Sequence, residues 1–178
     1  TVQITDNHGA TTNQTVNVVA TTSTNHPPTL SLSAQSGALL EAGAGVAGTS
    51  TASITATKAD PDSGDTASFD TTGWTSVDAT HVSKAGTYGN VVLNTATGVL
   101  AYTLDNAKAA TNGLAAGAAA TDAFAVTVSD GHGGSATQTA SFAITGSNDA
   151  PVPSVLAGDS VTGSVADNTS QATLTTTG

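Results

Sequence analysis

The sequence predicts an all-β protein built as an antiparallel, seven-stranded β-sandwich. Apolar and polar side chains alternate in several segments, as around Phe124, Val126 and Val128, and this period of two is expected where one face of a strand is buried. Turn-forming residues such as those of 130–134 separate the segments. Because no long helical pattern intervenes, the strands are expected to pack as two antiparallel sheets.

A motif near the end of the predicted sandwich also occurs at the start of the chain. Residues 126–133 read VTVSDGHG, and residues 2–9 read VQITDNHG. The spacing of about 125 residues is the size of a domain and longer than the period of solenoids or propellers. We therefore expect a tandem array, with the closing hairpin of one repeat in 1–24, a complete repeat in 25–149 and the opening strands of the next in 150–178. Neighbouring repeats are then the expected partners.

The first half of the complete repeat is predicted to contain three strands. Residues 30–32 and 51–57 alternate in the strand pattern, with a connection rich in Gly and Ala between them. The charged stretch 60–65 concentrates residues that break regular structure and is expected to be a loop. A third strand begins near Thr66 and includes Phe69, and an irregular section with Trp74 and His81 is expected to follow.

The second half is predicted to contain four strands and a short helix. Residues 88–93 and 99–104 flank a five-residue connection that ends in Gly98, which is typical of a hairpin. Residues 105–112 have the composition of a short helix, with Asp105 as its N-cap. After a loop at 113–121, the strand of Phe124 and a return strand at 140–144 complete the repeat.

The charge of the chain limits its partners. It carries 13 Asp and Glu residues against 3 Lys and no Arg, for a formal net charge of -10. Nucleic acid and anionic membrane surfaces attract basic residues, so neither is an expected partner. No apolar run approaches the roughly 20 residues of a membrane-spanning helix, so no membrane insertion is expected.

The predicted core is thin and has no covalent reinforcement. The chain has no cysteine, only 3% of its residues are aromatic, and Ala, Val and Thr fill most core-facing positions, so each strand buries little apolar area. Bound cations can supplement such a core, because a ligand that binds only the folded state increases its apparent stability. Solubility is an alternative reason for the acidic excess.

Three aspartates form the densest acidic cluster in the sequence, Asp60, Asp62 and Asp65. Calcium takes six to eight oxygen ligands, which closely spaced carboxylates and loop carbonyls can supply. The spacing does not match an EF-hand, and residues 130–138 do not match the calcium-binding RTX nonapeptide. We therefore predict a calcium site of another kind.

Strand parity predicts two acidic groups at opposite ends of the sandwich. Successive antiparallel strands reverse direction, so the loops after the second and sixth strands lie where the chain enters, and those after the first and fifth lie where it leaves. The upstream group would comprise Asp60, Asp62, Asp65 and Asp130, near Asn25. The downstream group would comprise Glu41, Asp105 and Asp149. The alternative is that each Asp only caps its own turn.

Several segments resemble the repeats called VCBS or bacterial cadherin-like domains: DPDSGD, YGNVVLNTATGVLAYTLDNA, LAAGAAATDAFAVTVSDGHGGSATQT and SNDAP. The resemblance implies an Ig-like sandwich, calcium at the domain ends and type I secretion. It places the chain in a giant extracellular adhesin, often carrying RTX repeats, at the cell surface of a Gram-negative bacterium. Its role there would be spacing or adhesion in cell-surface attachment or biofilm formation. Two linker positions depart from the pattern: the first linker has His26 where the second has Asp149, and Gly146 stands where the animal cadherin linker would have an acid.

Enzymatic activity is not expected, because no nucleophile elbow and no acid, His and Ser constellation can be placed. His8 and His132 occupy equivalent turn positions, which favours a turn role over a transition metal. Trp74 is predicted to anchor the core or an edge rather than stack on a sugar. The function is therefore predicted to be a calcium-rigidified spacer. Two alternatives are a ligand-binding module for sugar or peptide, and a filament subunit assembled by strand complementation between copies of the chain.

Overall fold

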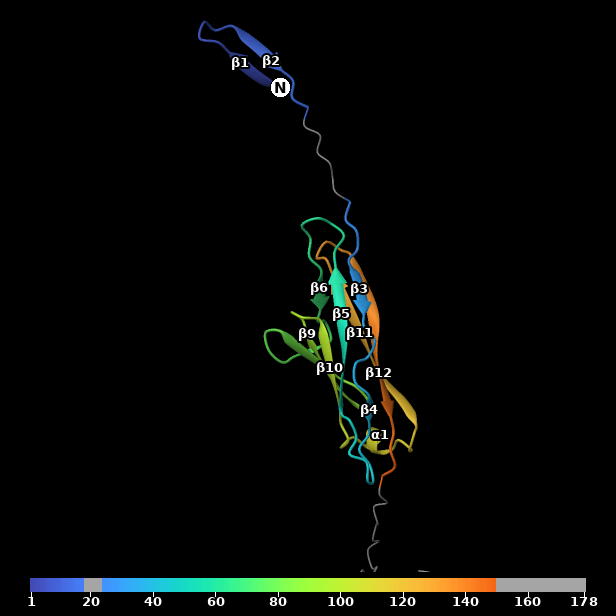
Figure 1. Cartoon of the computed structure of the whole chain (residues 1–178). Helices are drawn as coiled ribbons and strands as arrows, with labels where there is room; N and C mark the ends of the chain where they lie inside the picture. The colour runs from blue at the N-terminus through green and yellow to red at the C-terminus, as the bar shows by residue number, and fades with distance from the viewer. Residues whose placement is uncertain (18–23, 150–178) are drawn as a thin grey trace, which may run out of the picture.

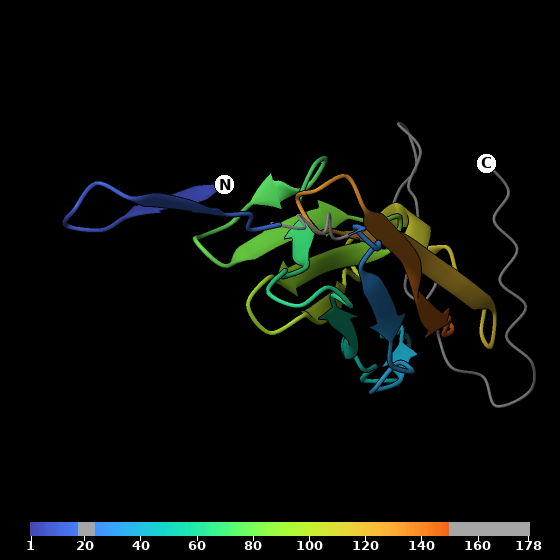
Figure 2. The ribbon, with the colours of Figure 1, turned by 90° about the horizontal axis from the view of Figure 1, so that it is seen from above.

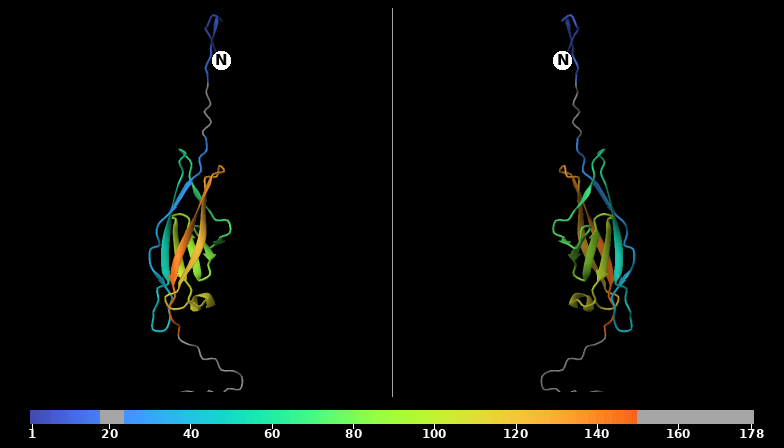
Figure 3. Two further views of the ribbon diagram at one scale, coloured as in Figure 1. Left: turned by 90° about the vertical axis from the view of Figure 1, so that its right-hand side faces the viewer. Right: turned by 90° about the vertical axis from the view of Figure 1, so that its left-hand side faces the viewer.

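The structure, a computed structural model, describes residues 1–17 and 24–149. The opening strands predicted for 150–178 lie outside the described residues. Residues 29–145 form two stacked sheets whose connecting loops gather at two opposite ends (Figure 1). Figure 3 shows this part of the chain side-on, with the two sheets as separate layers. The all-β, Ig-like architecture predicted from the sequence is confirmed.

The larger sheet has six strands in the spatial order β3 (Thr29–Leu32), β5 (Thr51–Ala59), β10 (Val99–Leu104), β9 (Gly89–Asn94), β8 (His81–Ala85) and β7 (Thr75–Ser76). The smaller sheet has four strands in the order β4 (Leu39–Leu40), β12 (Ser135–Thr145), β11 (Ala119–Ser129) and β6 (Ser68–Asp70). All of these pairs are antiparallel except β4 with β12. The short strands β6 and β7 are therefore edges of different sheets.

The core consists of alternate side chains from the facing sheets. Along β11, Phe124, Val126 and Val128 are buried, and β12 contributes Phe142. The ring of Tyr102 on β10 stacks on Phe142 with 4.7 Å between centroids. Aromatic pairs of this kind add to the stabilisation that burial provides, so the few aromatic residues concentrate at the centre of the core.

The strand count and the helix differ from the prediction. The seven predicted strands omit β4, β7 and β8. Strands β4 and β7 are only two residues long, and β8 has a single well-buried apolar side chain, Val82, so none of the three gives a period-two signal. The helix α1 is confined to Ala109–Asn112, and its N-cap is Lys108 without a side-chain cap. Asp105 instead accepts a bond from the Ala107 amide, 2.9 Å away, in the preceding turn.

The N-terminal segment forms a separate two-stranded sheet of β1 (Val2–Thr5) and β2 (Thr11–Gln14). The strands are antiparallel, with Val2 opposite Gln14, and every residue in them is exposed. Among residues 1–17 and 24–149, no helix is both long and apolar enough to cross a membrane.

Candidate metal sites at the two ends of the sandwich

The β5–β6 loop brings three carboxylates together at the upstream end, where the chain enters the sandwich. Asp60, Asp62 and Asp65 each offer an oxygen, and these atoms all lie within 4.8 Å of one another. The loop folds on itself because Asp60 Oδ1 accepts a bond from the Asp62 amide at 2.9 Å and the Asp62 carbonyl accepts one from the Asp65 amide at 3.1 Å. Gly64, with a φ of 97°, permits this tight reversal.

The incoming chain binds to both loops of this end. The Asn25 side-chain amide donates to Asp130 Oδ2 at 2.9 Å, and the His26 backbone amide donates to Asp62 Oδ2 at 2.6 Å. Figure 2 looks onto this end, where the loops after β5 and β11 both reach. The structure therefore brings Asp60, Asp62, Asp65 and Asp130 to the chain entrance near Asn25, as strand parity predicts.

Hydrogen bonds keep two of these carboxylates negatively charged. The backbone amide of His26, followed by its side chain, lowers the pKa of Asp62 below its ordinary value. The side-chain amide of Asn25 has the largest effect on Asp130, and with the His132 and Gly134 amides it lowers the pKa of that group. Both groups are thus anionic at neutral pH, as cation ligands must be.

Two histidines lie against the upstream cluster, which the sequence analysis did not anticipate. His26 Nδ1 lies 2.8 Å from Asp62 Oδ1, and His132 Nδ1 lies 3.3 Å from Asp65 Oδ2. Both imidazoles are largely exposed. The sequence carried no signal for this arrangement, because the two histidines are distant in the chain and meet only through the packing of the loops.

The chemistry of the cluster suits a hard cation. Asp60 Oδ2 is buried and has no hydrogen-bond partner within the described part of the chain. An unsatisfied buried polar group costs about 1–3 kcal/mol, and more when it is charged. A cation with oxygen ligands would remove that cost, and calcium is the cation that prefers carboxylate and carbonyl oxygens in an irregular loop.

The downstream end, where the chain leaves β12, centres on a completely buried glutamate. Glu41 has an exposed fraction of 0%. Its Oε2 accepts a bond from the Ser147 amide at 3.0 Å, and its own amide donates to the Thr145 carbonyl at 3.0 Å. Within residues 24–149, three buried oxygens here have no hydrogen-bond partner: Glu41 Oε1, Ser147 Oγ and Asp149 Oδ2. These three oxygens also suit a cation that takes oxygen ligands.

Close backbone packing holds the Glu41 segment against the outgoing chain. The Ala44 amide donates to the Asn148 carbonyl at 2.6 Å. A side chain at Gly43 would place its Cβ 2.1 Å from Ser147 Oγ, so only glycine fits this approach. Two segments about a hundred residues apart in sequence are therefore fixed together at this end.

Asp105, predicted for the downstream group, is exposed and caps its own turn. The neighbouring Asn106 is the residue of this turn that contacts the Glu41 segment, because its Oδ1 accepts a bond from the Ala42 amide at 3.0 Å. Asp105 therefore acts as a local turn cap, which was the alternative to a metal ligand. Glu41 and Asp149 remain the acidic candidates, with Ser147 as an additional oxygen.

A further buried carboxylate, Asp122 on β11, was not identified from the sequence. It is 4% exposed and accepts bonds from Tyr102 Oη at 2.6 Å and from three successive amides, those of Thr87, Tyr88 and Gly89, at 2.8–3.2 Å. Burial, followed by the bond to Asp122, raises the pKa of Tyr102. Because donors already surround the carboxylate, it fixes the 86–89 turn and is unsuited to a metal.

A two-layer, mainly antiparallel sandwich of this kind belongs to the class of Ig-like β-sandwich domains. The family model of the bacterial cadherin-like domain matches residues 25–146, which is more than half of the chain. The chain therefore belongs to the bacterial cadherin-like domain family, and the resemblance seen in the sequence is confirmed. Searches of curated proteins and of solved structures find no match.

Membership of this family indicates an extracellular, adhesin-type repeat. The family is a structural and adhesion module that is not typically enzymatic. Domains of this kind generally bind calcium, which agrees with the cluster of Asp60, Asp62 and Asp65.

Proposed function

We propose that the chain is a calcium-rigidified spacer repeat of a large adhesin on the surface of a Gram-negative bacterium, supporting attachment or biofilm formation. The observation that carries the proposal is the position of the acidic groups. They lie at the chain entrance and the chain exit, and both groups contain buried oxygens without partners in the described residues. Cations at these places would act on the joints between repeats.

At the upstream end, calcium would be held by Asp60, Asp62 and Asp65, with Asp130 beside them. Calcium takes six to eight oxygens, so loop carbonyls or a preceding repeat would complete the set. The segment at Asn25 and His26 already bonds to Asp130 and Asp62. A cation here would therefore also fix the direction of the linker that precedes the sandwich.

At the downstream end, Glu41 and Asp149 would supply the carboxylates, and Ser147 a hydroxyl. Glu41 directly follows β4, whereas Ser147 and Asp149 belong to the outgoing linker. A cation held by both segments would join the linker to the body of the repeat. Repeated along an array, such joints convert a flexible string of domains into a stiff one.

Thermal unfolding of the full chain in EDTA and in millimolar calcium tests the proposal. At a free calcium concentration about 100 times the Kd, a single site raises the unfolding free energy by about 2.7 kcal/mol. The double substitution Asp60→Ala with Asp62→Ala should remove most of the upstream share of the shift. Asp70→Ala is the matched control, because this exposed carboxylate bonds to Thr72 in its own turn. Equal melting temperatures with and without calcium would refute the proposal.

A second candidate function, subunit of an extracellular filament, is favoured by the hairpin of β1 and β2. Val2 and Ile4 on this hairpin are 54% and 58% exposed, and an isolated two-stranded hairpin is at best marginally stable. The hairpin of one copy would pair with residues 150–178 of the next, for which the sequence predicts opening strands, giving a head-to-tail fibre. A molecular mass by solution scattering that does not change with concentration would exclude the fibre and leave the spacer proposal intact.

A further inference from the structure

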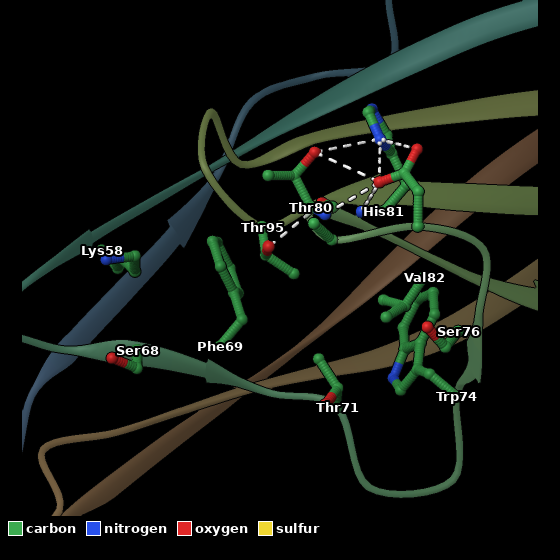
Figure 4. A pocket seen from close by; sticks show the side chains of 12 residues that line it. Lys58, Ser68, Phe69, Thr71, Trp74, Ser76, Thr80, His81, Val82 and Thr95 are labelled. Atoms are coloured by element: carbon green, nitrogen blue, oxygen red, sulfur yellow. Dashed lines mark hydrogen bonds and ion pairs between the residues drawn. The ribbon is translucent and has the colours of Figure 1, made fainter.

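A pocket of about 480 Å³ opens on the flank of the sandwich, and none of its lining residues is a candidate metal ligand. It lies between β6, the edge of the smaller sheet, and the β7 and β8 edge of the larger sheet, with Lys58 of β5 and Thr95 closing other sides. Its volume falls within the range of small-molecule sites, about 300–1,000 Å³. Figure 4 shows its side chains, which come from segments far apart in sequence.

Two aromatic side chains form fixed apolar surfaces in the pocket. Phe69 and Trp74 are only partly buried, yet both pack against the core. Trp74 follows a turn closed by its own amide and the Thr71 carbonyl at 3.0 Å. Lys84 Nζ lies 5.6 Å from the centre of the Trp74 ring, within the range of a cation–π contact. Trp74 is thus an anchor, as predicted, that also presents an aromatic surface to a ligand.

The opposite wall is a polar corner that is already ordered. Asp78 Oδ1 accepts bonds from the Thr80 amide at 2.8 Å and the His81 amide at 2.9 Å, and His81 Nδ1 lies 2.9 Å from both carboxylate oxygens. The Thr80 amide, followed by the His81 side chain, lowers the pKa of Asp78 to about 2. The carboxylate is therefore held in place, and its Oδ2, which among the described residues contacts only His81 Nδ1, has room for a further donor. Figure 4 shows these bonds around Thr80 and His81, apart from the rings of Phe69 and Trp74.

The charges of the lining favour a neutral ligand. The lining contains one lysine, Lys58, and one carboxylate, Asp78, and Lys58 donates to the Ala67 carbonyl beside the Phe69 ring. Most of the other polar groups are hydroxyls, from Ser68, Thr71, Ser76, Thr80 and Thr95. A hydroxyl can both donate and accept a hydrogen bond, so this surface matches a ligand whose own groups do both. An anionic ligand would meet Asp78.

We propose that this pocket binds a neutral saccharide unit of a glycan, with Trp74 against the apolar face of the sugar ring and Asp78, Thr80 and Ser76 bonding to its hydroxyls. A saccharide combines apolar ring faces with many hydroxyls, which is the combination that the two walls provide. This activity would add recognition to a repeat that otherwise only extends the chain. It is independent of calcium, since none of the candidate metal ligands lines the pocket.

The chain reports binding directly, because Trp74 is its single tryptophan. The full chain would be titrated with maltohexaose, cellohexaose, laminarihexaose and N-acetylated chitohexaose while Trp74 emission is followed. At least one of these neutral probes should give a saturable change. Asp78→Ala should weaken that binding about tenfold or more, which is the loss expected for a hydrogen bond to a charged group, about 1.5–3 kcal/mol.

Two further variants separate loss of the site from loss of the fold. Ser76→Arg fills the pocket from an exposed strand position and removes no core contact, so it should abolish binding while the melting temperature stays unchanged. Val77→Ala is the matched control, because Val77 is 57% exposed and is not part of the lining. Its affinity should equal that of the unmodified chain.

Three outcomes would overturn the proposal. One is the absence of a saturable response to every neutral probe at concentrations up to about 10 mM. This result would mean that the binding free energy is weaker than about −2.7 kcal/mol. Another is binding that persists in Ser76→Arg. The third is a response only to an acidic oligosaccharide, such as a hyaluronan hexamer, or only to an extended peptide added at the β6 or β7 edge. Repeating the titration in EDTA keeps this test separate from the calcium proposal, since glycan binding should be unchanged.

Discussion

The β1–β2 hairpin and the tip of the β11–β12 hairpin share a motif and a register, yet the apolar side chains of the first are exposed and those of the second are buried. Val2 pairs with Gln14 as Val126 pairs with Gln138, and Ile4 pairs with Thr12 as Val128 pairs with Ala136. Val2 and Ile4 are 54% and 58% exposed, whereas Val126 and Val128 are 1% and 0% exposed. The second hairpin has a facing sheet, and the first has none among the described residues.

The two turns show which part of this similarity is local. Asp6 Oδ1 accepts bonds from the amides of His8 and Ala10, both at 2.9 Å. Asp130 Oδ1 accepts the equivalent bonds from His132 at 2.7 Å and Gly134 at 2.9 Å. Each turn is therefore specified by its own aspartate. By contrast, the bond from the Asn25 side chain to Asp130 Oδ2 joins residues 105 apart in sequence. It therefore depends on the fold of the whole domain and not on the turn.

The largest effect should come from removing the buried carboxylate of Asp122, which lies on β11 outside the shared motif. Asp122→Ala would leave Tyr102 Oη and three backbone amides without their acceptor, at about 1–3 kcal/mol for each unsatisfied group and so a loss of at least about 4 kcal/mol. Urea unfolding of the full chain measures this loss. Asp105→Ala, at an exposed turn, should cost less than about 1 kcal/mol. Similar losses in the two variants would contradict the structural role of Asp122.

A matched pair of apolar truncations tests the comparison itself. Val128→Ala removes a fully buried side chain, and we expect a loss of about 2 kcal/mol in the unfolding free energy of the sandwich. Ile4→Ala, at the equivalent exposed position, should change it by less than about 0.5 kcal/mol. Thermal unfolding of both variants at several protein concentrations decides the matter. A large effect of Ile4→Ala that grows with concentration would mean that this hairpin is buried between copies of the chain.

Low pH should reveal a smaller difference between the turns of Asp130 and Asp6, seen in how the melting temperature depends on pH. The folded pKa of Asp130 lies below its ordinary value of 3.8, chiefly because of Asn25, so its stabilising contribution is present above about pH 4 and is lost as the pH falls below that value. In EDTA, the melting temperature should therefore decrease between about pH 4 and pH 2. Asp130→Asn should reduce this decrease. Asp6→Asn should leave it unchanged, and an equal effect of both substitutions would show that only the local turn matters.

The sequence by itself determined the features that depend on neighbouring residues. The period-two alternation of Val126 and Val128 specifies a half-buried strand, and Asp130 specifies the turn after it, because both signals act within a few residues. Strand reversal then places the loops of Glu41 and Asp60 at opposite ends without knowledge of any contact. The all-β class, the family resemblance and the positions of the two acidic groups were therefore predictable.

Tertiary structure decided which partners each side chain meets. Asp122 lies in a period-two strand like any other inward-facing residue, and only packing against Tyr102 and the 86–89 turn gives its carboxylate four donors. Asn106 rather than Asp105 reaches the Glu41 segment, and His26 meets Asp62, because of how separate loops pack. Strand β8 and the pocket beside Trp74 escaped prediction for the same reason. Long-range pairing and burial leave no periodic signal in a short segment, so they are fixed only when the two sheets come together.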